Sequence, residues 1–488
     1  MRDLFRMLQL GLLAFFVIVS AKAQQPQPIV TIMYSFSGTD GFNPDASLFQ
    51  GRDGCLYGTT MAGGQYYAPE DGEYGDGTVF KMTLSGAFTS LFSFDNTNGY
   101  YPQGPVMQGS DGNLYGTTQT AGTLPNGNPG YGYGTVFSMT TNGVLNYSVA
   151  LAGTNGNGIN SGLVQGLDGN FYGVAYGGGW AGYVSGQIEK SQDGTVFRVT
   201  PSGALTAIFT FDQLGSHSVG IYPSGGLVQG PDGTLYGTTA MTIYKITTNG
   251  AAALLFNLNG SGPTGPLVWG ANGNLFGVTT SGGTWGWGSV FQVSTNETFT
   301  NIFSFDGTNG SVQNYGADNF DFAGGLVLGS DGNFYAATVC GGPGFNQDVN
   351  YEGGTLYQIT PGGTFTSLYA FGNVPYDGFH PAGGLIQASD GNFYGVTFDG
   401  GTNTIGSIFR LSMPLPPVFK SVLQANGSTL LTWSAVGTRA YQLQFTTNLA
   451  APNWTSIGGQ ITATNDMLCE SDTSPSDAQR FYRVEMVR

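Results

Sequence analysis

The chain has 488 residues, a formal net charge of −16 and 9% charged side chains, and 82 of its residues are glycine. This acidic composition lacks the basic footprint of a nucleic-acid-binding protein and argues against polyanionic partners. The three cysteines (Cys55, Cys340 and Cys469) lie far apart without metal-ligand spacing, so free thiols are predicted, with one long-range disulfide as the alternative.

The N-terminus has the pattern of a secretory signal peptide. Arg2 and Arg6 precede an apolar run over residues 8–19, and Ala21-Lys22-Ala23 supplies the small residues that a signal peptidase reads. A retained membrane anchor is the alternative, but the apolar run is short for a bilayer span. We therefore expect residues 1–23 to be removed, no transmembrane segment to remain, and the mature protein to be secreted, extracellular or on the cell surface.

A tight turn that runs into a strand occurs seven times. Its clearest copy is Gly109-Ser110-Asp111-Gly112-Asn113-Leu114-Tyr115-Gly116-Thr117-Thr118. The turn pairs are Asp53-Gly54, Asp111-Gly112, Asp168-Gly169, Asp232-Gly233, Asn272-Gly273, Asp331-Gly332 and Asp390-Gly391. Because Asp-Gly favours two-residue hairpin turns, the repeated Asp is predicted to serve the turn rather than a metal.

Each repeat contains four strand candidates, here called a, b, c and d in chain order. In the third repeat they are residues 162–165, 170–174, 194–199 and 206–211. Successive turns are 57–64 residues apart, except for 40 between Asp232 and Asn272. Four short antiparallel strands in this length are typical of one blade of a β-propeller.

The N-terminal segment completes the count of strands. Residues 29–36 match strand d of the other repeats, whereas the seventh repeat stops after strand c at Leu411, before Pro414, Pro416 and Pro417. We therefore predict an all-β, seven-bladed β-propeller over residues 24–413, in which the N-terminal strand closes the last blade and leaves no open edge. A straight β-solenoid is the alternative, but it has no use for an orphan strand d.

The repeat resembles a known family. Leu-Tyr-Gly-Thr-Thr, a glycine-rich insert and Gly-Thr-Val-Phe-Lys/Arg are similar to the tandem repeat of the choice-of-anchor GloVer-containing proteins, over about residues 29–411. The fourth repeat departs, because it lacks the insert and the Gly-Thr pair. The resemblance implies a secreted bacterial repeat protein with a variable C-terminal anchor, yet the chain ends Glu485-Met486-Val487-Arg488 without a hydrophobic tail.

After a proline linker at residues 414–417 the composition changes. Strands are predicted over residues 429–433, 441–445, 454–457 and 481–486. Residues 418–488 are similar to a fibronectin type III-like β-sandwich whose core would contain Trp433, Tyr441 and Trp454. The region is short for that fold, so a further strand is expected.

The inserts between strands b and c are the candidate functional loops. By strand parity they share one face with the d-to-a connections, and their lengths vary widely, as those of functional loops do. They carry many aromatic residues, which suit stacking on sugars or apolar groups. These are Tyr66, Tyr67, Tyr74, Tyr131, Tyr133, Trp180, Tyr183, Trp285, Trp287 and Tyr351, with Phe345 beside them. The alternative is that the rings pack on one another and hold the loops down.

Candidate catalytic and metal-binding residues are few. Acidic groups cluster at Glu70, Asp71, Glu73 and Asp76 and at Asp318 and Asp321, where a solvated loop, structural calcium or glycoside cleavage are the alternatives. His217 and His380 fall in d-to-a connections without a nucleophile or metal partner in sequence, so locally bonded roles are expected. No metal site and no cofactor are predicted.

These observations favour a non-catalytic, monomeric binding module. Its insert face would hold an extracellular glycan or protein ligand. The alternative is a polysaccharide-active enzyme, a hydrolase or lyase, that uses carboxylates of the loops or of the central channel.

Overall fold

The computed structural model describes residues 28–487, except residues 72, 96, 121–132, 180–182, 185, 186, 189–192, 212–218, 260, 313–323, 344–352, 414–418, 426, 427, 436–439, 449–451, 466 and 474–479. The predicted signal peptide and proline linker lie outside these residues. Contacts divide the chain into two units, and the boundary between the larger and the C-terminal unit falls between Ser412 and Met413.

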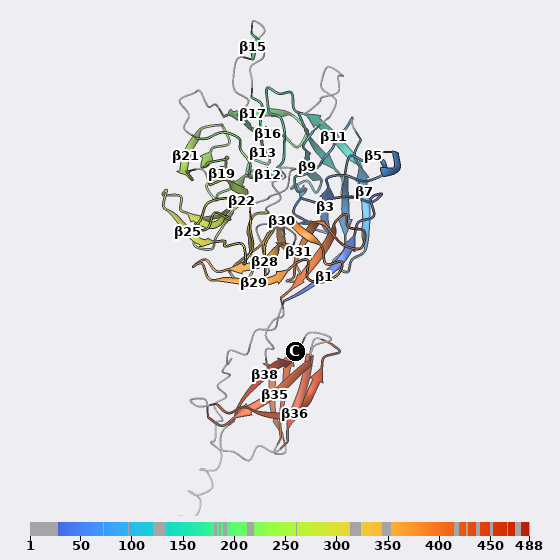
Figure 1. Cartoon of the computed structure of the whole chain (residues 1–488), viewed down its shortest axis with the longest axis vertical. Coiled ribbons are helices and arrows are strands. Elements are labelled where there is room, and N and C mark those ends of the chain that lie inside the picture. Colours follow the sequence, from blue (N-terminus) through green and yellow to red (C-terminus); the bar gives the residue numbers. More distant parts are fainter. Residues whose placement is uncertain are drawn as a thin grey trace, which may run out of the picture. The chain divides into compact units, whose positions relative to one another are not determined.

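The larger unit is a ring of seven four-stranded antiparallel sheets, counted over the described residues (Figure 1). The innermost strands a are β2 (Phe49–Gln50), β8 (Met107–Gln108), β12 (Val164–Gln165), β18 (Val228–Gln229), β22 (Pro263–Trp269), β26 (Val327–Leu328) and β30 (Phe379–Gln387). The b strands are β3 (Leu56–Thr60), β9 (Leu114–Thr118), β13 (Phe171–Ala175), β19 (Leu235–Thr238), β23 (Leu275–Thr279), β27 (Phe334–Thr338) and β31 (Phe393–Asp399).

The c strands are β6 (Thr78–Met82), β10 (Thr135–Met139), β16 (Thr195–Val199), β20 (Thr242–Ile246), β24 (Ser289–Val293), β28 (Thr355–Ile359) and β32 (Ser407–Ser412). The outer d strands are β7 (Phe88–Ser93), β11 (Leu145–Ala150), β17 (Leu205–Thr210), β21 (Ala252–Asn257), β25 (Phe299–Ser304), β29 (Phe365–Ala370) and β1 (Ile29–Ser35). Strands b and c are buried along almost their whole length, and the outer strands are partly exposed. The prediction of an all-β propeller is confirmed.

The N-terminal strand completes the last sheet, as predicted. β1 lies beside β32 in the order β1-β32-β31-β30, and Phe36 N donates a 3.1 Å hydrogen bond to Gly406 O. Fully buried Phe36 then joins a core cluster that contains Leu56 of the first sheet and Tyr394 of the seventh. The ring is therefore closed both by backbone hydrogen bonds and by apolar packing between its first and last sheets.

Paired hydroxyl groups explain the Thr-Thr and Gly-Thr halves of the repeat. Thr60 at the end of β3 and Thr78 at the start of β6 are fully buried partners in the sheet register, and their hydroxyl oxygens lie 2.8 Å apart. The same pair recurs between Thr118 and Thr135 at 2.8 Å. Each hydroxyl satisfies the other where neither reaches water, so both halves of the motif are needed in one blade.

The turn between strands a and b differs from the two-residue hairpin that was predicted. Gly109 N donates to Asn113 O at 2.8 Å, and Gly112 N donates to Gly109 O at 3.0 Å, so the loop comprises residues 110–112. Gly112 has φ of 88°, the left-handed conformation that follows a type I turn in three-residue hairpin loops. Asp is favoured because its carboxylate accepts hydrogen bonds from the following residues, not because it occupies a two-residue turn.

Two inserts of the propeller contain short structure of their own. The first holds β4 (Tyr67–Ala68), the 3-10 helix η1 (Pro69–Asp71) and β5 (Glu73–Tyr74), and the third holds β14 (Tyr183–Val184) and β15 (Gln187–Ile188). No helix among the described residues is long and apolar enough to cross a membrane.

The C-terminal unit consists of two three-stranded sheets. Their orders are β33 (Phe419–Ala425), β34 (Ser428–Ser434), β37 (Met467–Asp472) and β36 (Thr455–Thr462), β35 (Ala440–Thr446), β38 (Phe481–Val487). Trp433 and Tyr441 lie in its core, as predicted. The prediction for Trp454 is wrong, because this ring is half-exposed and the Arg483 guanidinium lies 4.4 Å from its centre. β33 and β37 are strands that the sequence pattern did not reveal.

Candidate functional site

A cavity of about 260 Å³ lies in the larger unit, where segments that precede or begin the innermost strands converge. Each of the seven sheets contributes one such segment. The segments contain Asp45 to Ser47, Gln103 and Pro105, Asn160 to Leu163, Ser224 to Leu227 without Gly225, Thr264 to Pro266, Gly324 and Gly325, and Gly383 and Gly384, and Gln119 completes the wall. The cavity is therefore a property of the whole ring, which no single repeat forms alone.

Close backbone packing holds the wall together. A Cβ atom on Gly225 would lie 2.3 Å from Gly265 O of the next sheet, so that position requires glycine. Elsewhere a threonine of strand b makes the link to the next sheet, since Thr117 Oγ1 donates to Ser161 O at 2.8 Å. The lining segments are thus fixed by their neighbours around the ring, and a ligand would meet a preformed wall.

Three buried polar atoms on this wall lack a hydrogen-bond partner among the described residues. They are Asp45 Oδ1, Asn160 Oδ1 and Ser161 Oγ. Native proteins pair almost all of their buried polar atoms, because an unpaired one loses its hydration without compensation. All three atoms belong to residues that line one cavity, where solvent or a ligand can reach them.

Asp45 is the acidic group among the described lining residues, which include no Lys, Arg or His. As a residue it is half-buried, in keeping with its place on the wall, whereas its Oδ1 atom is buried. Burial raises the pKa of the Asp45 carboxyl group well above its ordinary value, and a hydrogen bond from the residue's own backbone opposes this only in part. Burial therefore disfavours the ionised form of this carboxyl group.

The cavity lies on the insert side of the ring. Met61 N, at the start of the first insert, donates to Asn43 O at 3.0 Å, two residues before Asp45. In the second blade Gln119 N donates to Tyr101 O at 2.9 Å, two residues before Gln103. These bonds join inserts to d-to-a connections, as strand parity predicts, and both kinds of connection adjoin the cavity wall.

The predicted aromatic residues divide into exposed and packed groups. Tyr66, Tyr74 and Trp285 are 46%, 57% and 64% exposed. Tyr67 pairs with Tyr74 across the β4–β5 hairpin, and both rings lie beside Phe42, with centroids 6.2 and 6.4 Å from it.

Tyr133 and Trp287 are half-buried and pack against core clusters, as the loop-packing alternative expects. Tyr183 lies in β14, where the structure describes the backbone but not the side chain. Tyr131, Trp180, Phe345 and Tyr351 lie outside the described residues. Ligand binding by the exposed rings stays a prediction.

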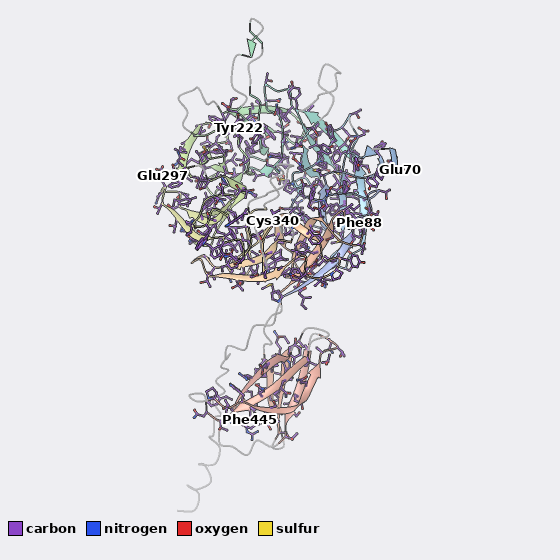
Figure 2. The ribbon with its side chains drawn as sticks, viewed as in Figure 1. Glu70, Phe88, Tyr222, Glu297, Cys340 and Phe445 are labelled. Atoms are coloured by element: carbon purple, nitrogen blue, oxygen red, sulfur yellow. The ribbon has the colours of Figure 1, made fainter. Side chains whose placement is uncertain are left out.

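The predicted acidic cluster does not join the cavity. Glu70 is exposed and lies at the rim of the ring (Figure 2). Among the described residues no group of three acidic, His or Cys side chains is arranged to hold a metal ion. Asp318 and Asp321 lie outside the described residues. The carboxyl group that faces the cavity is Asp45, which sequence reasoning missed.

His380 is locally bonded, as expected, whereas His217 lies outside the described residues. The Nδ1 atom of His380 lies 3.0 Å from Asp399 Oδ2. Burial lowers the pKa of His380, but the Asp399 hydrogen bond and the adjacent Cys340 side chain outweigh it and raise the pKa to about 10. Cys340 is 2% exposed and belongs to a core cluster, so this thiol is inaccessible to a substrate. All three cysteines are free thiols.

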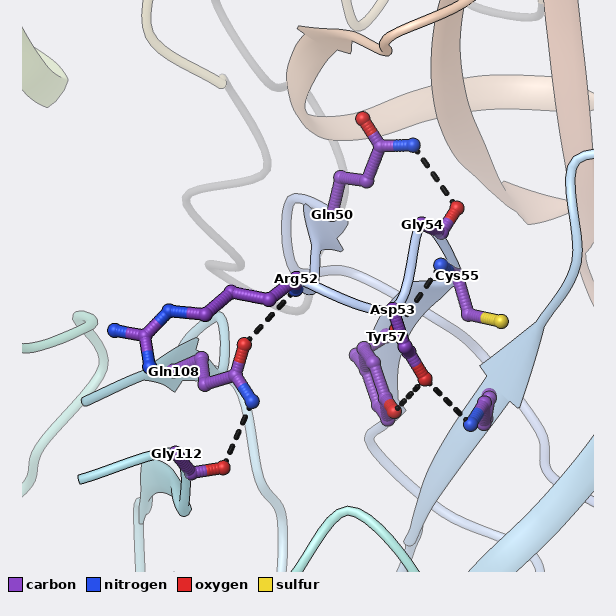
Figure 3. A network of polar contacts seen from close by, with 9 residues as sticks. Gln50, Arg52, Asp53, Gly54, Cys55, Tyr57, Gln108 and Gly112 are labelled. Atoms are coloured by element: carbon purple, nitrogen blue, oxygen red, sulfur yellow. Dashed lines mark hydrogen bonds and ion pairs between the residues drawn. The ribbon is translucent and has the colours of Figure 1, made fainter. Parts of the chain in front are cut away.

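A ring of glutamine contacts on the opposite side was also missed. Gln108 Oε1 accepts from Arg52 N at 3.0 Å, and its Nε2 donates to Gly112 O at 2.7 Å, so it joins its own a-b turn to that of the preceding blade (Figure 3). Equivalent glutamines are Gln50, Gln165, Gln229 and Gln387. The signal was present, because each stands three residues before the Asp of its turn.

The chain is similar to several solved structures. A streptogramin B lyase is 14% identical, with a TM-score of 0.49 over 80% of this chain and 98% of that chain. Virginiamycin B lyase from Staphylococcus aureus is 14% identical, with a TM-score of 0.48 over 80% and 100% of the two chains. A gluconolactonase from Xanthomonas campestris is 12% identical, with a TM-score of 0.37 over 82% and 94%.

A comparison with curated proteins found no significant match. The Gloeobacter/Verrucomicrobia repeat matches residues 20–188 and 127–323, which together make up more than half of the chain. Both matches fall on the segments that carry the turn and strand motifs, so the resemblance inferred from those motifs is confirmed. The chain belongs to the Gloeobacter/Verrucomicrobia repeat family.

Proposed function

We propose that this protein is a secreted, non-catalytic binding module that holds a small, hydroxyl-rich group, such as the terminal sugar of an extracellular glycan, in the central cavity. The observation that carries the proposal is the set of three buried, unpartnered polar atoms on one cavity wall, Asp45 Oδ1, Asn160 Oδ1 and Ser161 Oγ. Ligand sites typically combine a preformed concave wall with a few convergent polar groups of this kind.

The exposed rings extend the same proposal to a longer ligand. Tyr74 and Trp285 belong to inserts, which emerge on the cavity side of the ring. A glycan whose terminal sugar enters the cavity would place its next units near such rings, and aromatic faces stack well on sugars. The cavity would then select the terminal unit, and the rings would add affinity for the remainder.

A glycan-array screen followed by titration calorimetry tests this function. Asn160→Leu removes one of the unpartnered acceptors at nearly constant size. We expect it to weaken binding of an array-selected glycan at least about fivefold, since the loss of a buried hydrogen-bond partner costs about 1–3 kcal/mol. The matched control is Asn296→Leu, the same change at an exposed turn position. Equal affinities for both variants would rule out the cavity as the site.

A specific observation also favours a second candidate, a polysaccharide-cleaving enzyme. Burial raises the pKa of Asp45 and so favours its protonated form, which a general acid requires. Glycosidases, however, usually require two carboxyl groups, and the described cavity wall holds one. A reducing-sugar assay distinguishes the candidates: an enzyme releases sugar ends that disappear in Asp45→Asn, whereas a binding module releases none.

A further inference from the structure

The unpartnered atoms of the cavity share one hydrogen-bonding character. Asn160 Oδ1 is an acceptor, Ser161 Oγ accepts as well as donates, and Asp45 Oδ1 accepts when the carboxyl group is ionised. With Asp45 ionised, all three atoms can therefore accept hydrogen bonds from a partner that offers several donors. An ammonium group offers three N–H donors from one atom, whereas a hydroxyl group offers one.

The charges around the cavity point in the same direction. The described wall contains the carboxyl group of Asp45 and no basic side chain. Over the whole chain 30 acidic residues outnumber 14 Lys and Arg residues, which gives a net charge of −16. A buried carboxyl group without a cationic partner is unfavourable as a carboxylate, and a cation brought in by the ligand would reverse this.

We infer that the group held in the cavity is a primary amine, so that the ligand is an amino sugar with a free ammonium group that pairs with the Asp45 carboxylate. This inference rests on the proposed function and narrows its ligand class. Asn160 Oδ1 and Ser161 Oγ accept the remaining N–H and O–H groups of the same ligand. A charge-assisted hydrogen bond is about twice as strong as a neutral one, so the amine outcompetes a neutral sugar.

Proton release follows from this arrangement. In the free protein burial raises the pKa of the Asp45 carboxyl group and so favours its neutral form. The ion pair needs the carboxylate, so binding of the ammonium form displaces the proton from protonated Asp45. Affinity for the amine therefore rises with pH through the Asp45 titration, until the amine of the ligand itself loses its proton. A neutral sugar causes no such release.

The test compares two probes that differ only in their acetyl groups, the trimer of glucosamine and the trimer of N-acetylglucosamine. Titration calorimetry at neutral pH in two buffers with different ionisation enthalpies measures both affinity and proton release. We expect the glucosamine trimer to bind at least tenfold more tightly and its binding to release protons. Asp45→Asn should abolish both the preference and the proton release, whereas Glu297→Gln, which removes an exposed carboxylate, should change neither.

The outcomes separate this inference from the function on which it rests. Equal affinities, or tighter binding of the acetylated trimer in a manner sensitive to Asn160→Leu, would overturn the amine and leave cavity binding in place. If neither trimer nor any array glycan binds to a protein with a normal melting transition, the proposed function fails and the inference fails with it. Preference for the amine that persists in Asp45→Asn would overturn the ion pair.

Discussion

Tyr115 Oη donates a 2.7 Å hydrogen bond to Asp111 Oδ2, which joins the first strand after the turn to the turn itself. Asp111 Oδ1 accepts from Asn113 N at 3.1 Å, so one carboxylate supports both the loop and the buried tyrosine. The same pair recurs at Asp53 and Tyr57, Asp168 and Tyr172, Asp331 and Tyr335, and Asp390 and Tyr394. The fixed spacing of Asp and Tyr in the repeat follows from this bond.

Removal of the bond should destabilise the propeller modestly. Tyr115→Phe removes one hydrogen bond from a carboxylate oxygen that still accepts from Asn113 Nδ2, so we expect the free energy of unfolding to fall by about 1 kcal/mol. Tyr236→Phe in the fourth blade is the matched control, because both carboxylate oxygens of Asp232 there accept from Thr234 instead. Urea unfolding of both variants measures the difference. Equal losses would show that the bond contributes nothing specific.

The same carboxylates should make the protein sensitive to acid. Burial alone would raise the pKa of Asp111, but hydrogen bonds from Tyr115 and Asn113 outweigh it and lower the pKa below its ordinary value. A group whose pKa is lowered in the folded state stabilises that state above the unfolded pKa, and its contribution disappears as pH falls through the folded value. We therefore expect stability to decline below about pH 4. Asp111→Asn should flatten that decline in a series of urea titrations, and an unchanged slope would contradict the assignment.

Deletion of the N-terminal strand should open the ring. Without residues 29–36 the edge of β32 loses its hydrogen-bonding partner, and the cluster around Leu56 and Tyr394 loses Phe36. We expect a sharp fall in the melting temperature and self-association through the exposed edge. The control is a chain that begins at residue 28 and keeps β1. Unchanged melting of the deletion variant would refute closure by this strand.

The two tryptophans of the fifth insert should behave differently. Trp287 packs against a core cluster, so Trp287→Ala should lower the free energy of unfolding by about 2 kcal/mol. Trp285 is 64% exposed, so Trp285→Ala should leave the melting temperature nearly unchanged and weaken binding of a longer glycan. Differential scanning calorimetry and glycan titration distinguish the two. A large stability loss in Trp285→Ala would assign this ring to loop packing.

The His380 and Asp399 pair should stabilise the protein at neutral pH and lose its effect in alkali. The pKa of His380 rises from 6.5 to about 10 on folding, mainly because the Asp399 hydrogen bond outweighs the opposing effect of burial. A raised pKa gives stability that is fully present below about pH 6.5 and is lost as pH rises through about 10. Asp399→Asn should therefore destabilise the protein at pH 6 and much less at pH 10.5. A pH-independent difference between the variants would contradict this coupling.

Much of the fold could be predicted because the repeat is encoded locally. The turn residues, the alternation of glycine with strand residues and the orphan strand at residues 29–36 are all visible in one sequence, and together they specify the ring. The predicted type of turn was wrong because Asp-Gly suits both two- and three-residue loops. Only the hydrogen bonds of Gly109 distinguish these two loop lengths. Trp454 was wrongly placed in a core because a large aromatic ring also packs well against the guanidinium of a neighbouring arginine.

The candidate site could be predicted only in part. Strand parity located the insert side, but aromatic composition did not tell exposed rings such as Trp285 from packed ones such as Trp287, because that depends on contacts across the insert. Asp45 and Asn160 were missed because they come from different blades and meet only when the ring closes. Their common position, just before an innermost strand, was the available signal.

A crystal structure of the protein soaked with an array-selected glycan would show whether the ligand enters the cavity. We expect electron density for the terminal sugar in the central cavity, with polar atoms within hydrogen-bonding distance of Asp45 Oδ1 and Asn160 Oδ1. Density for the ligand on Trp285 or on the outer strands, with the cavity empty at saturating ligand, would contradict it.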